Sequence, residues 1–168
     1  QRARIGRRGR RGAGLVVMRD GVVQEIGTPQ EVYAQPANLH VARFMGYRNV
    51  VELPVTADRD GWVTLESPDM KLTGVRKLPL GGKRASVAIR PEEITIVTEA
   101  AAENVIGGSL GKVEYGGSDL VVGVVTGEGA GFYARDAGRV SPGQTGVSQG
   151  TPQAVRVIPG YWKPSVGG

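Results

Sequence analysis

The sequence predicts a mainly β protein in which a β-hairpin and two short helices precede a small domain of short strands. Three observations favour this fold class. Gly and Pro are frequent, at 27 and 10 of 168 residues, and they place turns along the whole chain. Short apolar and β-branched runs lie between those turns, as in all-β domains. Only residues 28–46 follow a helical apolar period instead.

The hairpin is predicted from residues 15–18 and 22–26, which form two short apolar strands. Asp20 and Gly21 lie between them. Both residue types tolerate the positive φ angles that a tight two-residue hairpin turn requires. We therefore expect the two strands to pair in an antiparallel manner.

A first helix is predicted to begin at Thr28-Pro29-Gln30-Glu31. Thr28 can cap the helix, Pro29 suits its first position, and Glu31 can reach back as the partner in a capping box. The helix must be short, because Gln35 precedes Pro36 and a residue before proline disfavours the α conformation.

A second helix is predicted to begin at the cap Asn38 and to end at Gly46, a residue type that commonly terminates helices. Its apolar positions give one buried and one exposed face. These positions are Leu39, Val41, Ala42, Phe44 and Met45.

Beyond Gly46 the apolar period changes to the alternation of β-strands, which favours a small barrel or sandwich. Turns are expected at Asp60-Gly61, Pro91, Gly116-Gly117 and Gly127–Gly129. The predicted strands cover residues 50–56, 62–65, 71–73, 85–90, 94–98, 105–115, 119–125, 131–135 and 154–158. Residues 159–168 are predicted to be a flexible tail.

The positive charge is concentrated at the N-terminus. Residues 1–12 hold six arginines and no acidic residue, so 21 − 6 = 15 basic residues face 16 acidic residues in the remainder. Residues 1–14 show no apolar period and are predicted to be a disordered basic tail. Such a tail could bind nucleic acid or anionic lipid, but a solvated segment without a partner is the simpler interpretation.

Few residues could carry catalysis. The chain has no Cys, and its one histidine, His40, has no second His or Cys to complete a typical zinc or Cys-His site. As neighbours in a strand, Glu92 and Glu93 would point to opposite faces and could not share acid-base work, so a solvated turn is the simpler interpretation. We therefore predict no catalytic, cofactor-binding or metal-binding residue.

Two glycine-rich stretches could be mistaken for phosphate or anion sites. Residues 80–84 contain Gly-Gly-Lys but lack the first Gly and the Ser or Thr of a phosphate-binding loop. The Tyr115-Gly116-Gly117 stretch could offer amides to an anion, but Gly-Gly is more often a hairpin turn. No apolar run reaches the ~20 residues needed to cross a bilayer, and no signal peptide is visible.

Residues 16–33, from Val16-Val17-Met18-Arg19-Asp20-Gly21 to Gly27-Thr28-Pro29-Gln30-Glu31-Val32-Tyr33, resemble the end of the nucleotide-binding domain in importer ABC ATPases. Pro36, residues 41–46 and Asn49 look like the connector that leaves that domain. Ile89-Arg90-Pro91-Glu92-Glu93-Ile94 is similar to a signature in the family's C-terminal domain, and Tyr115-Gly116-Gly117 fits its later half. The likeness is to importers of polyamines, sugars, glycerol phosphate or ferric iron.

The resemblance implies four segments: a basic tail over 1–14, a remnant of the ATPase domain and connector over 15–46, an OB-like small β-barrel of the TOBE type over 47–158, and a tail over 159–168. It places Gly46 and Asn49 in the connector, beside the helix-cap residues Thr28, Pro29 and Glu31 predicted above. It places three residues at a barrel corner with a possible regulatory contact: Arg90, Pro91 and Glu92.

The family's catalytic motifs are missing from this sequence. Walker A, the signature motif, Walker B and the switch histidine precede the last hairpin in the family, and His40 follows it. We therefore expect no ATP hydrolysis and no cofactor in this chain, whereas an intact member would use ATP and magnesium. The Arg-Gly-rich residues 1–14 suggest, as a hypothesis, a truncated, frameshifted or trimmed coding sequence.

The resemblance further implies ABC permease subunits and a second copy of the chain as partners, at the inner face of the cell membrane. Two alternatives come from other classes. One is a nucleic-acid-binding OB fold with an Arg-rich arm, against which stand the near-neutral remainder and few aromatics for base stacking. The other is a small-anion-binding barrel.

Overall fold

The structure, a computed structural model, describes residues 4–6, 14–97, 104–116, 119–136, 145–150 and 156–158. The chain divides into two compact units: unit 1 ends at Tyr47 and unit 2 begins at Arg48. The sequence placed this division one residue earlier, after Gly46.

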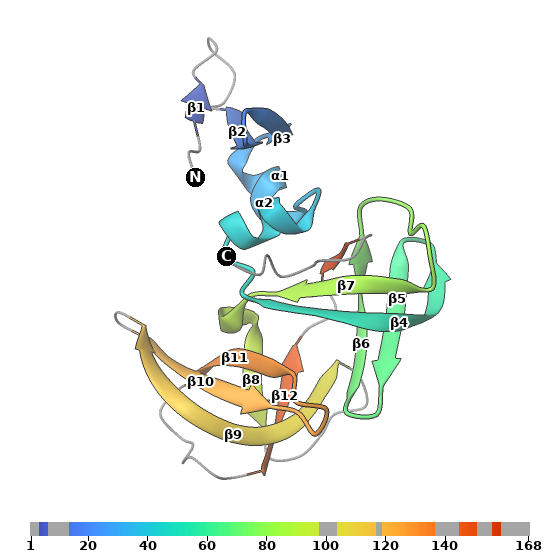
Figure 1. Ribbon diagram of the computed structural model, residues 1–168, viewed down its shortest axis with the longest axis vertical. Helices are drawn as coiled ribbons and strands as arrows, with labels where there is room; N and C mark the ends of the chain where they lie inside the picture. The colour runs from blue at the N-terminus through green and yellow to red at the C-terminus, as the bar shows by residue number, and fades with distance from the viewer. Residues whose placement is uncertain are drawn as a thin grey trace. The chain divides into compact units, whose positions relative to one another are not determined.

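Unit 1 contains a three-stranded antiparallel sheet in the order β1-β2-β3 (Figure 1). The strands are β1 (Arg4–Gly6), β2 (Gly14–Arg19) and β3 (Val22–Gly27). Asp20 and Gly21 have φ angles of 50° and 80°, so both adopt the left-handed conformation of a tight hairpin turn. The predicted hairpin is confirmed.

The predicted disorder over residues 1–14 is wrong at the residues that form strands. Arg4 pairs with Val16 and Gly6 pairs with Gly14, which extends the hairpin by a third strand. The pairing uses backbone N–H and C=O groups, which every non-proline residue carries, so it does not require an apolar period. The rest of that segment, residues 1–3 and 7–13, lies outside the described residues.

Both helices begin as predicted. In α1 (Pro29–Ala34) the Glu31 amide donates to Thr28 Oγ1 at 3.2 Å, and the Thr28 amide donates to Glu31 Oε2 at 2.8 Å. This is the reciprocal capping box. In α2 (Leu39–Phe44) the Val41 amide donates to Asn38 Oδ1 at 3.0 Å. The core of unit 1 lies between the hairpin and the helices and is formed by Val17, Val32 and Val41.

The end of α2 is closed by two backbone hydrogen bonds. The Gly46 amide donates to the Arg43 carbonyl at 3.1 Å, and the Tyr47 amide donates to the Ala42 carbonyl at 3.0 Å. Gly46 has a φ of 90°. This is a Schellman motif, and glycine suits its left-handed position because it has no Cβ. The prediction that the helix stops at Gly46 is confirmed.

Unit 2 is built from ten strands among the described residues and one short 3₁₀ turn, η1 (Pro91–Glu93). The strands are β4 (Asn49–Arg59), β5 (Trp62–Ser67), β6 (Met70–Arg76), β7 (Arg84–Ile89), β8 (Ile94–Val97), β9 (Val105–Gly116), β10 (Asp119–Val125), β11 (Gly131–Asp136), β12 (Thr145–Gly150) and β13 (Arg156–Ile158). The mainly β class, with a hairpin and two short helices before it, is confirmed.

The strands pair in the order β11-β10-β9-β6-β13-β7-β4-β5, and β5 also pairs with β6. The pairings among β6, β13, β7, β4 and β5 therefore run in a cycle. Strand β13 is parallel to β6, and the other described pairs of the unit are antiparallel. The long strand β9 curves beside β10 and β11 (Figure 1).

One strand of unit 2 was absent from the sequence prediction. Strand β12, with the sequence Thr-Gly-Val-Ser-Gln-Gly, has no apolar alternation and was not predicted. Its backbone pairs with both β8 and β9, so its position depends on distant strands. The turn expected at Pro91 is present, since Glu92 and Glu93 lie in η1; Pro91 occupies its first position and cannot continue the β7 ladder.

The hydrophobic core of unit 2 lies between strands from all parts of the unit. Its members alternate with partly exposed residues along β5 and β6, as the pleat requires, whereas the five residues of β7 after Arg84 are all buried. They include Leu53, Val63, Leu65, Leu72, Val87, Ile89, Ile106, Leu110, Val122, Val124 and Phe132.

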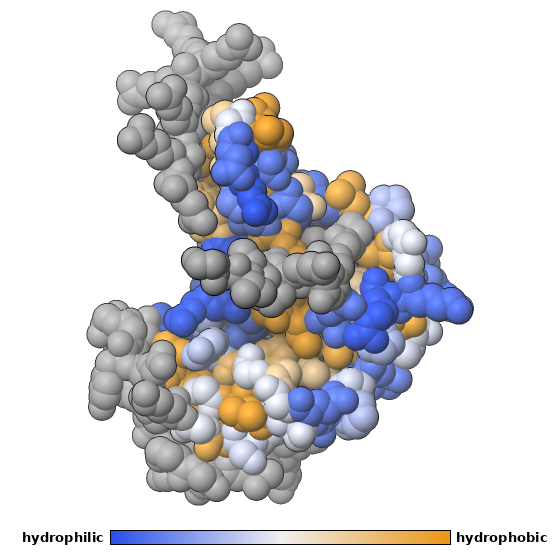
Figure 2. Space-filling model, in the orientation of Figure 1, coloured by the Kyte–Doolittle hydropathy of each residue, from blue (hydrophilic) through white to orange (hydrophobic). Residues whose placement is uncertain are grey.

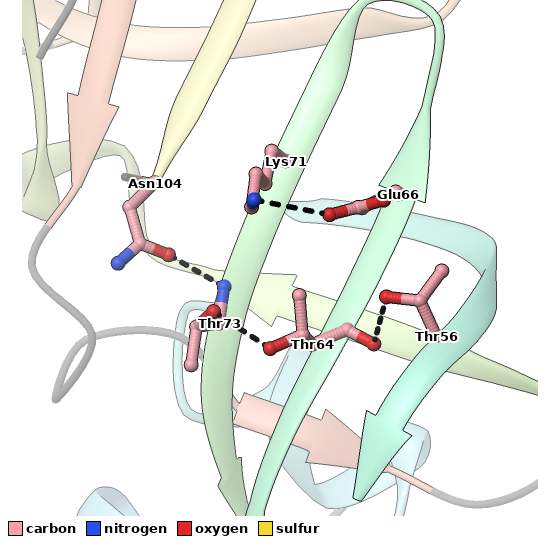
Figure 3. Close-up of polar contacts among 6 residues, drawn as sticks. All are labelled: Thr56, Thr64, Glu66, Lys71, Thr73 and Asn104. Carbon is pink, nitrogen blue, oxygen red and sulfur yellow. Dashed lines mark hydrogen bonds and ion pairs between the residues drawn. The ribbon is translucent and has the colours of Figure 1, made fainter. Parts of the chain in front are cut away.

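A row of polar contacts lies across β4, β5 and β6 (Figure 3). Thr64 Oγ1 and Thr73 Oγ1 are 3.0 Å apart, and Thr56 Oγ1 donates to the Thr64 carbonyl at 3.3 Å. The Thr73 amide donates to Asn104 Oδ1 at 2.7 Å, and Asn104 has a φ of 55°. Asn104 thus takes the place of a paired strand at this point of β6.

One glycine of β9 is required by close packing. A Cβ built on Gly108 would lie 2.7 Å from both the Val125 carbonyl oxygen and Val124 Cγ1 of β10. Because the oxygen belongs to the backbone of the neighbouring strand, the strands themselves would have to separate. Gly131 of β11 is a matched contrast, since a Cβ there would meet nothing within 4 Å.

We predict that Gly108→Ala destabilises the protein by about 1–3 kcal/mol, the usual cost of overpacking a tight contact. Gly131→Ala should be neutral or slightly stabilising, because alanine reduces the conformational freedom of the unfolded chain. Urea unfolding of both variants, followed by Trp fluorescence, measures the difference. Equal stability of the two variants would show that β9 and β10 do not approach as described.

Candidate functional site

The side chain of Asn49 joins the start of β4 to β11. Asn49 is 1% exposed. Its Nδ2 donates to the Tyr133 carbonyl at 2.7 Å, and its Oδ1 accepts from the Tyr133 amide at 2.7 Å. The side-chain amide therefore satisfies both backbone groups of one residue, as a neighbouring strand would. We call these two bonds the Asn49–Tyr133 bridge.

The backbone of Asn49 has a second role, because it pairs with Ile89 of β7. Asn49 thus connects three strands, β4 and β7 through its backbone and β11 through its side chain. Next to it, the guanidinium of the exposed Arg48 lies 4.6 Å from the centre of the Tyr133 ring. A cation–π contact of this kind contributes about 0.5–1 kcal/mol at an exposed site.

Arg90 follows Ile89 directly. Its side chain is only 6% exposed, so it is a buried residue of the corner and not a surface residue. Arg90 Nη2 donates to Glu93 Oε1 at 3.0 Å, and Nε donates to Glu93 Oε2 at 3.3 Å. The guanidinium donates two parallel hydrogen bonds to the carboxylate, which gives the turn η1 a defined geometry.

Pro91 and Glu92 have different environments in the same turn. Pro91 is buried at the first position of η1, whereas Glu92 is exposed. The turn contacts β11, the strand that the Asn49 side chain also binds. Asn49 and the Arg90 corner, which the sequence placed in separate groups, therefore meet around β11. We call Arg48, Asn49, Arg90, Glu93 and Tyr133 the corner cluster.

The other predicted site residues lie in unit 1. Thr28, Pro29 and Glu31 form the start of α1, and Gly46 ends α2. Their observed roles are those of helix caps. Tyr133 was missed by sequence reasoning, because it contributes its backbone and any non-proline residue in a strand carries the same groups.

The remaining sequence candidates take no part in the corner cluster. His40 lies in α2, and Tyr115 and Gly116 end β9, while Gly117 lies outside the described residues. Within the described ranges, no three His, Cys, Asp or Glu side chains gather where they could hold a metal ion. No helix in the described part of the chain is long and apolar enough to span a membrane.

The turn at Gly127–Gly129 is held by an acidic side chain of the same chain. The Glu128 amide donates to Asp69 Oδ2 at 3.0 Å, and the Asp69 carbonyl accepts from the Gly107 amide at 2.8 Å. A Cβ on Gly127 would lie 2.9 Å from Asp69 Oδ2. An amide that an anion could have used is therefore bonded to an internal carboxylate.

We predict that Asn49→Leu destabilises unit 2 by about 2–5 kcal/mol, because it leaves the amide and carbonyl of Tyr133 without their partners. Thr56→Val is the control, since Thr56 is exposed and makes a longer bond of 3.3 Å. Its effect should stay within about 0.5 kcal/mol, as for ordinary surface substitutions. Chemical denaturation compares both with the wild type, and equal midpoints would contradict the importance of the bridge.

Comparison with known proteins shows similarity to ATP-binding proteins of importers. The chain is 41% identical over 85 residues to the spermidine/putrescine import ATP-binding protein PotA of Oleidesulfovibrio alaskensis, covering 49% of this chain and 22% of that protein. It is 38% identical over 110 residues to PotA of Marinobacter nauticus, covering 63% of this chain and 29% of that protein. It is 35% identical over 112 residues to the uncharacterized ABC transporter ATP-binding protein YcjV of Escherichia coli O157:H7, covering 64% and 31%. No protein-family profile matches the chain.

Among solved structures, the cytoplasmic molybdate-binding protein ModG, crystallised with molybdate bound, superposes with a TM-score of 0.58. The likeness covers 67% of this chain and 96% of ModG at 18% identity, so it shows the fold alone. The sequence matches span 22–31% of the length of the curated relatives. Over this partial length, the chain is homologous to the ATP-binding proteins of ABC importers.

Proposed function

We propose that this chain is the accessory and regulatory C-terminal part of the ATP-binding subunit of an ABC importer. The observation that carries the proposal is the 35–41% identity to import ATP-binding proteins over 85–112 residues. The intact subunit would couple ATP hydrolysis to uptake of a small solute such as a polyamine, a sugar or iron. This chain alone would not hydrolyse ATP and would hold no cofactor.

In this proposal, unit 2 is an OB-like β-barrel of the TOBE type. The cyclic pairing of β6, β13, β7, β4 and β5 supports it, because a cycle of paired strands leaves no open edge within itself. The fold-level likeness to ModG supports the same assignment. The function of ModG does not carry over, because a shared fold hosts many functions.

Unit 1 would be the last hairpin of the ATPase domain together with the connector. Its sheet has one face covered by the helices, whereas β3 exposes Val22, Val23 and Ile26 at 62%, 47% and 70%. Apolar side chains are visible at the surface where Figure 1 draws β2 and β3 (Figure 2). Three exposed apolar side chains on one six-residue strand favour a covering partner in the intact subunit.

The proposed partners are permease subunits and a second copy of the chain, and the proposed place is the inner face of the cell membrane. The burial of the corner residues supports a more specific proposal. Arg90 and Pro91 are buried and fix the backbone, so a regulatory contact through the corner would use the exposed Glu92.

A chimera tests the proposal. The part of Marinobacter nauticus PotA that matches this chain is replaced by the matching part of this chain, and spermidine uptake and ATP hydrolysis are measured with the full transporter. We expect uptake well above that of a PotA deleted of the same region. The same chimera with Asn49→Leu is the matched control and should lose uptake with its fold. An assembled, folded chimera no better than the deletion would contradict the proposal.

The exposed apolar side chains of β3 give a second prediction. Val23 and Ile26 pair with Met18 and Val16 of β2, so they share the face of the hairpin opposite to the buried Val17. The chain should self-associate through this face, and Ile26→Lys should weaken this association. Burying an isoleucine contributes about 1.5–3 kcal/mol, and 1.4 kcal/mol is about tenfold in a dissociation constant. Sedimentation velocity should therefore show a dissociation constant raised roughly tenfold or more. Val125→Lys is the control, because Val125 is an apolar residue of unit 2 that is 47% exposed, and it should leave the dissociation constant unchanged. Equal effects of Ile26→Lys and Val125→Lys on the dissociation constant would show that the interface is not on β3.

A further inference from the structure

We propose that the outer face of the sheet formed by β4, β5 and β6 is a binding surface for a short, uncharged oligosaccharide. Val63, Leu65 and Leu72 belong to the core of unit 2, so their neighbours along the strands point to the opposite face. Directly opposite residues of paired strands share one face. The outer face consists of Ala57 and Arg59 of β4, Trp62, Thr64 and Glu66 of β5, and Lys71, Thr73 and Val75 of β6.

Trp62 gives this face an aromatic platform. It is 41% exposed, and among the residues of unit 2 whose burial the structure describes it is the only exposed aromatic residue. Its direct partners in the two ladders are Arg59 and Val75. The face of an indole ring is negatively polarised, whereas a sugar ring presents C–H groups with a small positive charge on one of its faces. A sugar ring that stacks on Trp62 therefore gains both apolar contact and electrostatic attraction.

Threonine hydroxyls lie beside this platform on β5 and β6 (Figure 3). Thr64 and Thr73 are directly opposite, and their Oγ1 atoms are 3.0 Å apart, so one hydroxyl donates to the other. A hydroxyl has one donor and two acceptor sites, so the pair keeps one donor and several acceptor sites for a ligand. Sugar hydroxyls also donate and accept, and they can use both kinds of site.

An ion pair lies on the same face, farther along β5 and β6. Lys71 Nζ is 3.2 Å from Glu66 Oε1, and the two side chains are 55% and 40% exposed. Glu66 follows Trp62 by four residues, which corresponds to about 13 Å along a strand. A ligand of two or three linked sugar rings covers this length. Its hydroxyls would accept from the ammonium and donate to the carboxylate.

The charges of the face favour an uncharged ligand. Lys71 is paired with Glu66, and the charge of Arg59 is offset by Asp60, the next residue in the chain. Nucleic acids bind to surfaces with an excess of positive charge, and single strands stack successive bases on several aromatic side chains. A protein partner needs an apolar centre, whereas this face surrounds one tryptophan with mostly polar groups. An uncharged ring compound rich in hydroxyls fits these side chains best.

Titration of the full chain with neutral trisaccharides tests the proposal. The probes are maltotriose, cellotriose and xylotriose, and nitrogen–proton correlation NMR reports which backbone amides respond. We expect at least one trisaccharide to shift the amides of β5 and β6 in a saturable manner. The binding should be weak, because an open face covers less of a ligand than a pocket does.

Three variants locate the binding. Trp62→Leu keeps an apolar side chain but removes the aromatic ring, so it should raise the dissociation constant about tenfold. Phe44→Leu is the matched control, because Phe44 is also 41% exposed and lies in α2, and it should leave binding unchanged. Thr64→Val keeps the β-branched shape and removes the hydroxyl, so it should weaken binding several-fold. The amide spectrum of each free variant verifies that its fold is retained.

The proposal is overturned if none of the three trisaccharides shifts the amides of β5 and β6. It is also overturned if Trp62→Leu and Phe44→Leu weaken binding equally, which would indicate unspecific stacking on any exposed ring. Oligothymidylate is titrated in parallel, and a response of the same amides to this probe alone would assign the face to single-stranded nucleic acid instead. None of these measurements involves ATP or transport, so the sugar-binding face can fail while the chimera succeeds, and the reverse.

Discussion

The structure of unit 2 depends on hydrogen-bond partners for the backbone amide and carbonyl of Tyr133. These two groups lie at the edge of β11 that faces away from β10. A buried amide or carbonyl without a partner costs about 1–3 kcal/mol, and no strand pairs with β11 on that side among the described residues. The Asn49 side chain supplies both missing partners. Because Asn49 is also the first residue of β4, the same contact fixes where the unit begins.

The bridge also explains why the corner cluster forms. Asn49 pairs with Ile89, so Arg90 leaves β7 beside β11, where its side chain is buried. A buried guanidinium is costly unless a carboxylate accepts its hydrogen bonds, and Glu93 does so with both oxygens. Pro91 ends the ladder and bends the chain so that Glu93 can reach back. The contacts of the corner cluster thus follow from the position of the Asn49 side-chain amide.

The sequence was sufficient to predict those parts of the fold that are determined by contacts between residues close together in the chain. The caps at Thr28 and Asn38 and the turn at Asp20-Gly21 were predictable because their hydrogen bonds or φ angles involve residues at most three apart. Strands β1 and β12 were not, because their backbones are paired with distant strands and their side chains carry no alternation. Asn49 was identified only by resemblance, and its partner Tyr133 lies 84 residues away.

The two units differ in how completely they bury their apolar residues, and this bears on the proposed function. Unit 2 encloses a core drawn from most of its described strands, whereas the core of unit 1 rests on Val17, Val32 and Val41. A core that small gives little stability by itself. The same unit exposes Val22, Val23 and Ile26 on β3. A small core and an uncovered apolar strand in one unit agree with a hairpin that a larger ATPase domain would complete, while unit 2 carries its own core.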